Sequence, residues 1–416
     1  MNSMAGRRYG DRSCRKHDAA PSRLSTVRVI RHTTTRSPFR NICGPEHTGE
    51  PRAGQSRRIG RGGRLDDGMP HNSTPRPLIV RPVPPFRLDL TVWALRRRRR
   101  NAIDRWDHGT YRRIVVLGGR VTTLSVRQSE SSESPRLVVR STPSPRTPAD
   151  RRQLRTLIER LFGTGIDLND WYRIARQDRR LGILADRFRG MKPPRFPTVF
   201  EAVVNAFACQ QLSLEVGLEL LNRLAVVCAV RSNAGFDGQF GFPEASDLAK
   251  LPPSRYQAIG FSRQKVGALL ALARAVDRNK VNLEALSNNT DVDACQRLLE
   301  LRGVGRWTAE YVLLRGLGRL HVFPGDDVGA QKRLARWLGR PNALDYDGVR
   351  RAVAKWQPYA GLVYFHLLLD GLMQTGALSD SNGTDRRERV GKEPVESNAA
   401  KSETRRRRLP LLRDRS

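Results

Sequence analysis

The stretch Leu301-Arg-Gly-Val-Gly-Arg-Trp-Thr-Ala-Glu-Tyr-Val-Leu-Leu-Arg-Gly316 decides how the rest of the chain is interpreted. It follows a segment with helical apolar spacing that begins at Asp291, which we expect to cap that helix. Gly303-Val304-Gly305 predicts a tight turn, and a second helix is expected to begin at Arg306 or Trp307. Backbone N–H groups at the start of that helix form a phosphate site without side-chain charge. A Gly-x-Gly turn is also a common simple helix cap, so the turn alone is weak evidence for a phosphate site. The flanking Leu-Arg and Trp-Thr-Ala strengthen that interpretation.

The charge of the chain favours a polyanionic partner over a small neutral substrate. Its 416 residues include 75 Lys and Arg against 41 Asp and Glu, a net charge of +34 and a pI near 11.3. The excess is not confined to the ends, because residues 76–375 hold 49 basic and 28 acidic residues. No stretch approaches the roughly 18 apolar residues that span a bilayer. Residues 1–30 show no secretory signal. We therefore expect no membrane partner and a cytoplasmic location, at the nucleoid in a bacterium.

Five scattered cysteines argue against a disulfide framework, a zinc site and a cysteine-ligated iron–sulfur cluster. The seven histidines show no metal-ligand spacing either, so we expect neither a metal nor a cofactor. The cysteines are Cys14, Cys43, Cys209, Cys228 and Cys295.

Composition divides the chain into four parts. Residues 1–75 are predicted to be a disordered basic segment, and residues 376–416 a disordered basic tail. Residues 76–148 are predicted to form a small α+β domain, and residues 149–375 a helical domain. The expected fold class is therefore mainly α, with a small antiparallel sheet near the N-terminus.

Local patterns place individual elements in these parts. Strands are expected over 86–92, 114–126 with a central Gly-Gly turn, and 136–140, with a helix near 149–162. The Arg96–Arg100 run either grips phosphate or forms a solvated helix face.

A further helix start is well marked. Thr198 and Glu201 fit a capping box. Phe200 and Phe207 then follow at core spacing, which makes them packing residues.

Four ordered motifs resemble the helix-hairpin-helix (HhH-GPD) superfamily of DNA base-excision glycosylases, in its 3-methyladenine DNA glycosylase II branch. They are the hairpin 301–316, Pro324-Gly-Asp-Asp-Val328, Trp356-Gln-Pro-Tyr-Ala-Gly361 and Cys209-Gln-Gln-Leu-Ser213. The resemblance implies a two-lobed helical fold with a small N-terminal domain of TATA-binding-protein-like shape. It also implies a monofunctional enzyme that flips and excises alkylated purines from double-stranded DNA.

The resemblance assigns the catalytic carboxylate to Asp327, the second acid of the pair. Breaking an N-glycosidic bond develops positive charge on the sugar, which a nearby carboxylate stabilises. Either acid could instead cap the following helix. We expect one of Asp326 and Asp327 to cap and the other to catalyse.

The resemblance also implies three further sets of site residues. Aromatic rings that stack on the flipped base are assigned to Trp307, Tyr311 and Tyr359, although Tyr311 is equally suited to core packing. The wedge that fills the gap left by the base is assigned to Gln211 with Leu212, whose loop could instead serve structural hydrogen bonds. Val328 makes one pocket wall small. The residues implied to bind phosphate through the main chain are Gly303, Val304, Gly305, Arg306 and Thr308.

In the lyases of the superfamily that this chain resembles, a Schiff-base lysine occurs within the second hairpin helix or on its approach. Here Trp307 stands at the hairpin-helix position and no lysine lies between Lys280 and Lys332, which argues against a lyase. A monovalent cation at the hairpin is possible by family analogy, and Arg263 and Lys265 are candidates for backbone contacts to DNA. The alternatives are a non-catalytic DNA-binding protein and a glycosylase of the same fold for oxidised or deaminated bases. We expect the protein to act as a monomer.

Overall fold

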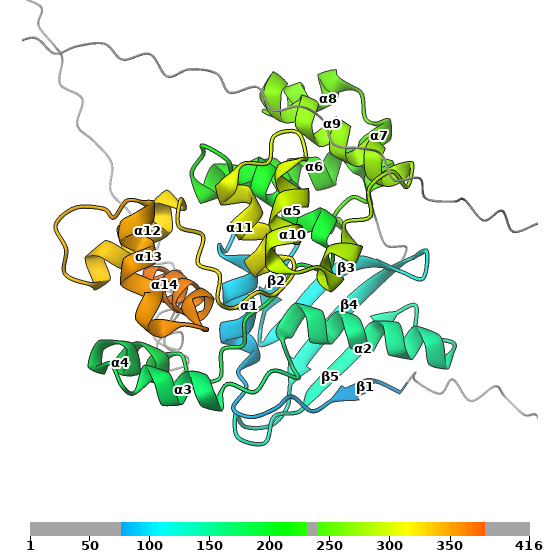
Figure 1. Cartoon of the computed structure of the whole chain (residues 1–416). Helices are drawn as coiled ribbons and strands as arrows, with labels where there is room; N and C mark the ends of the chain where they lie inside the picture. The colour runs from blue at the N-terminus through cyan, green and yellow to red at the C-terminus, as the bar shows by residue number, and fades with distance from the viewer. Residues whose placement is uncertain (1–75, 231–238, 379–416) are drawn as a thin grey trace, which may run out of the picture. The chain divides into compact units, whose positions relative to one another are not determined.

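The computed structural model describes residues 76–230 and 239–378. The predicted N-terminal basic segment and nearly all of the predicted C-terminal tail lie outside these residues. The described part is mostly helical with one small antiparallel sheet, as the sequence predicts (Figure 1).

The sheet has five strands in the order β1-β5-β4-β3-β2, and each neighbouring pair is antiparallel. The predicted Gly-Gly hairpin is confirmed, because Leu117 pairs with Arg120 across Gly118 and Gly119. Both glycines have positive φ (+57° and +73°), which a two-residue turn of this kind requires. The strands are β1 (Leu78–Val80), β2 (Arg105–Asp107), β3 (Thr110–Leu117), β4 (Arg120–Gln128) and β5 (Leu137–Thr142).

The strand predicted over 86–92 is wrong, since these residues enter helix α1 (Leu88–Arg96). Every residue of α1 except Asp89 is buried, so the helix has no polar face to reveal its period in the sequence. Its β-branched residues favour a strand locally, and burial on all sides overrides that preference. The helix ends at Arg97, which has a left-handed φ of +64°.

Thirteen more α-helices follow in the described residues. Helix α2 runs across the sheet, α7 and α9 pack together, and α12 packs on α14 (Figure 1). Short 3₁₀ helices occupy Glu284–Asn288 and Ala354–Trp356. The α-helices are α2 (Pro148–Phe162), α3 (Asn169–Ala175), α4 (Arg179–Arg187), α5 (Val199–Cys209), α6 (Leu214–Cys228), α7 (Ala245–Lys250), α8 (Pro253–Ala258), α9 (Arg263–Asp277), α10 (Asp291–Leu299), α11 (Arg306–Arg315), α12 (Val328–Trp337), α13 (Tyr346–Val353) and α14 (Ala360–Gln374).

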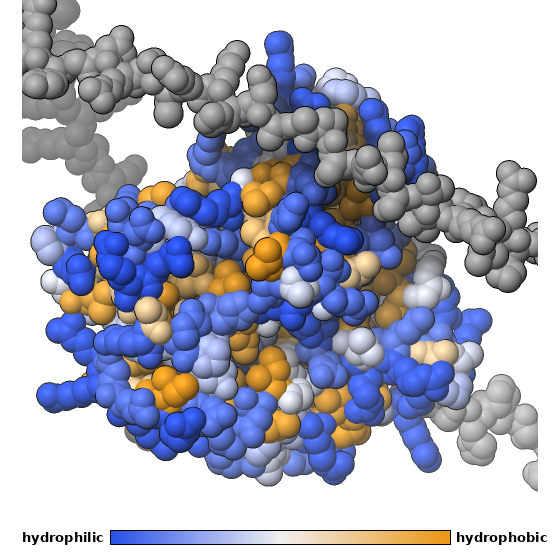
Figure 2. Space-filling view, viewed as in Figure 1, coloured by the Kyte–Doolittle hydropathy of each residue, from blue (hydrophilic) through white to orange (hydrophobic). Residues whose placement is uncertain are grey.

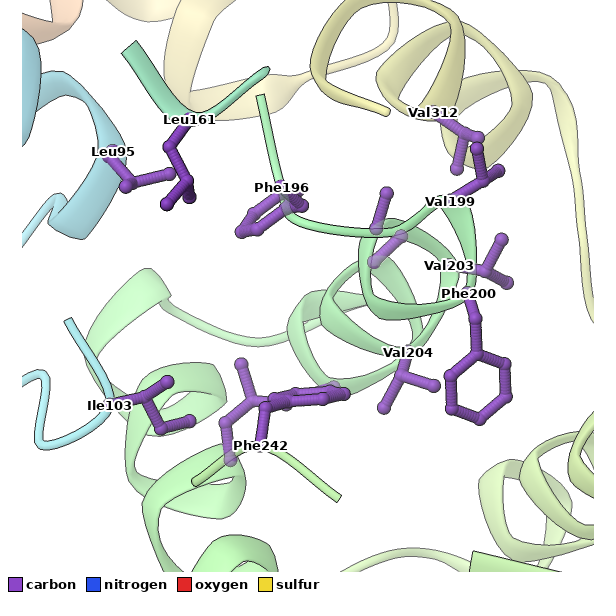
Figure 3. Packing of buried hydrophobic residues seen from close by; sticks show 14 of the residues in the cluster. Leu95, Ile103, Leu161, Phe196, Val199, Phe200, Val203, Val204, Phe242 and Val312 are labelled. Carbon is purple, nitrogen blue, oxygen red and sulfur yellow. The ribbon is translucent and has the colours of Figure 1, made fainter. Parts of the chain in front are cut away.

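Two hydrophobic cores hold these elements. One contains sheet residues such as Leu124 together with Val204 of α5 and Val312 of α11. Figure 3 shows the α5 side chains of this core packed beside Phe196 and Phe242. The second core joins α3, α4 and α12–α14 around Trp171 and Trp356. Because the first core is continuous from the sheet to the helices, the α+β part shares its interior with the helical part.

Helix α5 begins where predicted, and Phe200 and Phe207 are buried in the core. The Thr198 hydroxyl accepts a hydrogen bond from the Glu201 N–H, but the Glu201 carboxylate does not complete the capping box. It pairs instead with Arg113 of β3, which also donates to Asp104 at 2.6 Å. All three side chains are at least 95% buried, so this network fixes α5 to the sheet.

Candidate active site

The predicted hairpin of two helices is present, with α10 and α11 on either side of the Gly303–Gly305 turn. Gly303 has a φ of +84°, and a Cβ there would lie 2.7 Å from the Ala268 Cβ, so only glycine fits. Gly305 is the N-cap of α11, and a Cβ there would meet nothing within 4 Å. One detail differs from expectation. Thr290, not Asp291, caps α10, because its hydroxyl accepts from the Asp293 N–H.

The first turn of α11 presents free backbone donors. Within the described residues, the N–H groups of Arg306, Trp307 and Thr308 have no acceptor. Val304 and the Thr308 side chain are buried, so Thr308 can meet a ligand only through its main chain. The Arg306 side chain makes a bidentate pair with Asp326 (2.6 and 3.0 Å). The turn is therefore suited to an anion bound by main chain at a helix N-terminus.

The 209–213 loop is attached directly to this turn. Gln210 donates from Nε2 to the Gly303 carbonyl and to the Thr308 hydroxyl, both at 2.9 Å. Lys265 donates to the Gln210 carbonyl at 2.7 Å, so its ammonium closes the C-terminal end of α5 and is not directed at a ligand. Arg263 is exposed.

The two predicted wedge residues stand at the tip of the loop. Gln211 is exposed with a φ of +54°, and the Leu212 side chain is 42% exposed. The structural hydrogen bonds that the sequence allowed for this loop are made by Gln210. No hydrogen bond holds the Gln211 side chain among the described residues, so it is free to enter a ligand.

A cavity of about 530 Å³ lies beside the hairpin and this loop. A larger cavity of about 940 Å³, between β3, α2 and α7, contains none of the predicted site residues, so the smaller cavity is the candidate site. The smaller cavity is lined by Arg97, Arg98, residues 209–214, Trp307, Tyr311, residues 326–329, Lys332, Arg333, Tyr364 and Leu368.

Asp327 occupies the wall of the cavity and caps α12 at the same time. Its Oδ1 accepts from the Ala330 N–H at 2.8 Å, and its Oδ2 accepts from the Tyr364 hydroxyl at 3.0 Å. Asp326 caps no helix, because it pairs with Arg306. The capping acid is thus Asp327, the same residue that the resemblance assigns to catalysis, so an arrangement in which Asp326 caps and Asp327 catalyses does not hold. Capping fixes the carboxylate of Asp327 and leaves its second oxygen on the cavity side.

Two of the three predicted aromatic residues line the cavity. The rings of Trp307 and Tyr311 lie 5.4 Å apart at 35°, and Trp307 is partly exposed. Tyr359 lies outside the cavity, which corrects its predicted role. It precedes α14 and packs edge-on against Trp171 in the second core. Tyr364, one turn into α14, takes the cavity position.

Burial raises the pKa of Tyr364 well above its ordinary value, and the neighbouring Asp327 carboxylate raises it further. The phenol therefore stays protonated and donates to Asp327. Sequence reasoning missed Tyr364 because nothing local separates it from the apolar residues around it.

The Arg96–Arg100 run was expected either to grip phosphate or to form a solvated helix face. Most of it does neither. Arg96 is buried and donates to the Arg98 and Arg99 carbonyls. Arg97 is buried beneath the cavity, and Arg98 lines the cavity while pairing with Glu215 at 3.4 Å. Only the last two arginines are exposed. The left-handed turn at Arg97 directs its side chain inward.

The described residues contain no cluster of three potential metal ligands among His, Cys, Asp and Glu. None of their helices combines the length and apolarity that crossing a membrane requires.

Comparison with known proteins identifies relatives of this chain. A family model described as HhH-GPD superfamily base excision DNA repair protein matches residues 204–358. The DNA-3-methyladenine glycosylase of Bacillus subtilis is 28% identical over 223 residues, covering 52% of this chain and 73% of that protein. DNA-3-methyladenine glycosylase 2 of Escherichia coli is 27% identical, covering 45% of this chain and 63% of that protein.

A third relative and a solved structure add to these. DNA-3-methyladenine glycosylase 1 of Schizosaccharomyces pombe is 30% identical, covering 40% of this chain and 65% of its own length. The structure of a 3-methyladenine DNA glycosylase from Archaeoglobus fulgidus shares the fold with a TM-score of 0.63. It is 24% identical and covers 73% of this chain and all of that chain.

Residues 204–358 belong to the HhH-GPD superfamily of base excision DNA repair proteins. The relatives named above are DNA-3-methyladenine glycosylases, which are hydrolases, and they support that branch of the superfamily for this chain.

Proposed function

We propose that this protein is a monofunctional DNA glycosylase that flips alkylated purines of the 3-methyladenine type out of double-stranded DNA and hydrolyses their N-glycosidic bond with Asp327. One observation carries the proposal. Asp327 presents a carboxylate, oriented by the Ala330 N–H and the Tyr364 hydroxyl, to a cavity whose wall also contains two neighbouring aromatic rings.

DNA binding begins at the hairpin. The unpaired N–H groups of the α11 first turn suit a backbone phosphate, and the strongly basic chain adds salt-dependent attraction. Gln210 joins the hairpin to the 209–213 loop, so a phosphate held there fixes the position of Gln211 and Leu212 relative to the duplex. These two side chains fill the space that the flipped base leaves.

The flipped base then enters the cavity. Alkylated purines are cationic, and Trp307 offers an electron-rich ring face, a contact worth about 0.5–2 kcal/mol. As the glycosidic bond lengthens, positive charge develops on the sugar. The Asp327 carboxylate stabilises this charge and orients the attacking water. A cationic base leaves as a neutral molecule, so it requires no proton from the enzyme.

The monofunctional part of the proposal rests on Trp307, which stands where a lyase of this superfamily carries its lysine. The structure adds one amine to consider, because Lys332 of α12 lines the cavity. Borohydride treatment of the enzyme with abasic duplex DNA decides the matter. We expect no trapped covalent complex, and a complex that disappears in Lys332→Ala would make the enzyme a lyase.

The direct test is release of methylated bases from alkylated duplex DNA, with products identified by mass, for wild type and Asp327→Asn. Asparagine remains a good N-cap, so this variant removes the charge and keeps α12 intact. Asp345→Asn is the matched control, because Asp345 caps α13 outside the cavity by accepting from the Gly348 N–H. We expect Asp327→Asn alone to abolish release while both variants bind DNA.

If wild-type protein binds DNA and releases no methylated base, the alkylated-purine assignment fails. Oxidised and deaminated bases are then tested on the same duplex. A non-catalytic DNA-binding protein follows only if these are retained as well.

A further inference from the structure

The cavity is lined by a buried arginine that no step of the proposed reaction uses. Arg97 is 97% buried, comes from the turn after α1, and lines the same cavity as Asp327. Its guanidinium donates to the Tyr311 hydroxyl at 2.9 Å and to the Asn205 Oδ1 at 2.7 Å. Neither partner is a carboxylate, so the positive charge of Arg97 is not neutralised by a direct ion pair among the described residues.

This contact determines what Tyr311 can offer to a bound base. A phenol oxygen accepts hydrogen bonds and carries one hydrogen, which lies near the ring plane. Because Arg97 occupies the oxygen as donor, the Tyr311 hydrogen is directed elsewhere, and no residue in the described ranges accepts it. The other cavity phenol, Tyr364, has already given its hydrogen to Asp327. Tyr311 is therefore the phenol that remains free to donate into the cavity.

The surroundings keep Tyr311 in its donor form. Burial raises the pKa of Tyr311, while Arg97 and Arg315 oppose the rise. Arg315 lies behind the ring with its guanidinium carbon 5.8 Å from the ring centroid. At neutral pH the group is thus a protonated phenol whose oxygen is polarised by an adjacent cation.

We propose that Arg97 is a specificity-determining residue that acts through Tyr311, and that the pair extends excision to uncharged damaged bases. The proposal rests on the proposed glycosylase function. When the leaving base is uncharged, negative charge builds up on it as the glycosidic bond breaks. A preorganised donor backed by a buried cation stabilises that charge. A cationic alkylated base leaves as a neutral molecule and gains less from the same donor.

The test compares two lesions in one duplex sequence. Single-turnover excision rates are measured for hypoxanthine, an uncharged base, and for 7-methylguanine, a cationic base. The quantity of interest is the ratio of the two rates on the same preparation, because the fraction of correctly folded enzyme cancels in it. Variants are Arg97→Met, Arg97→Lys, Tyr311→Phe and the double variant. Tyr256→Phe is the control, since that buried hydroxyl donates to the Leu248 carbonyl outside the cavity.

We expect the wild type to release both bases. The ratio of hypoxanthine to 7-methylguanine excision should fall about tenfold or more in Arg97→Met and Tyr311→Phe. The double variant should fall no further, because the two residues act as one unit. Arg97→Lys should recover part of the ratio, and Tyr256→Phe should leave it unchanged.

Two results overturn the inference while leaving the proposed function intact. One is release of 7-methylguanine without hypoxanthine by the wild type. The other is an unchanged ratio in both Arg97→Met and Tyr311→Phe. Release of neither base from DNA that the protein binds would instead contradict the proposed function itself.

Discussion

Substituting the two hairpin glycines one at a time should affect different properties: Gly303→Ala should lower protein stability, and Gly305→Ala should lower DNA affinity. Gly303 has a φ of +84° and a virtual Cβ 2.7 Å from Ala268, whereas Gly305 has a φ of −108° and open space around its virtual Cβ. Gly303→Ala should therefore cost about 1–2 kcal/mol for the left-handed backbone alone, with the clash added. Gly305→Ala should change the free energy of unfolding by less than about 1 kcal/mol, since a poorer N-cap is offset by lower chain entropy.

For DNA affinity we expect the reverse order, with the larger loss in Gly305→Ala. A methyl group at Gly305 occupies the space next to the free N–H groups of α11, where the phosphate would approach. Loss of one charge-assisted hydrogen bond is worth about 1.5–3 kcal/mol, so the dissociation constant should rise at least tenfold. Urea unfolding gives the stability, and fluorescence anisotropy with an undamaged duplex at two salt concentrations gives the affinity.

The matched pair makes the reasoning refutable. A Gly305→Ala protein that unfolds at wild-type urea concentration and binds DNA as tightly as wild type would show that the hairpin does not hold phosphate through its main chain. A Gly303→Ala protein of unchanged stability would show that the turn tolerates a side chain and that its glycine is not required.

Three further perturbations test the rest of the structure. Burial lowers the pKa of His366 to about 4, below its unfolded value of 6.5, so its contribution to stability is present above pH 6.5 and is lost as the pH falls. Wild type should lose about 2 kcal/mol of unfolding free energy between pH 7 and pH 5 relative to His366→Leu, measured by urea unfolding; equal losses in both proteins would refute this. Arg113→Met should cost about 3–5 kcal/mol in the same assay, because it leaves Asp104 and Glu201 buried without their cation; a cost below about 1 kcal/mol would show that the network contributes little. Leu212→Ala should lower single-turnover excision without changing the melting temperature, and a protein that excises at the wild-type rate would exclude a wedge role for Leu212.

Features set by neighbouring residues were predictable from the sequence. Gly118-Gly119 requires a tight hairpin turn, Thr198 begins α5, and Gly303–Gly305 separates two helices, each through local backbone chemistry. A helix start after Asp326-Asp327 followed from the same kind of signal, although the sequence left open which of the two acids is the cap.

Features set by distant contacts were not predictable. The helical state of α1 depends on burial by several other elements. The inward turn of Arg97 depends on Tyr311, 214 positions away. The exchange of Tyr359 for Tyr364 depends on where α14 begins and which side faces Asp327. None of these features produces a recognisable pattern in the sequence of its own segment.

The shared interior of sheet and helices has a consequence for exchanging parts between relatives. Arg97 enters the cavity from the α+β part, while Tyr311 and Asp327 enter it from the helical part. A chimera joined near residue 148 would combine an arginine from one parent with a tyrosine from another, and would replace one side of a continuous core. If Arg97 acts through Tyr311 as proposed, both segments together set the lesion preference, and recombination between them should alter that preference more readily than point changes in the helical part alone.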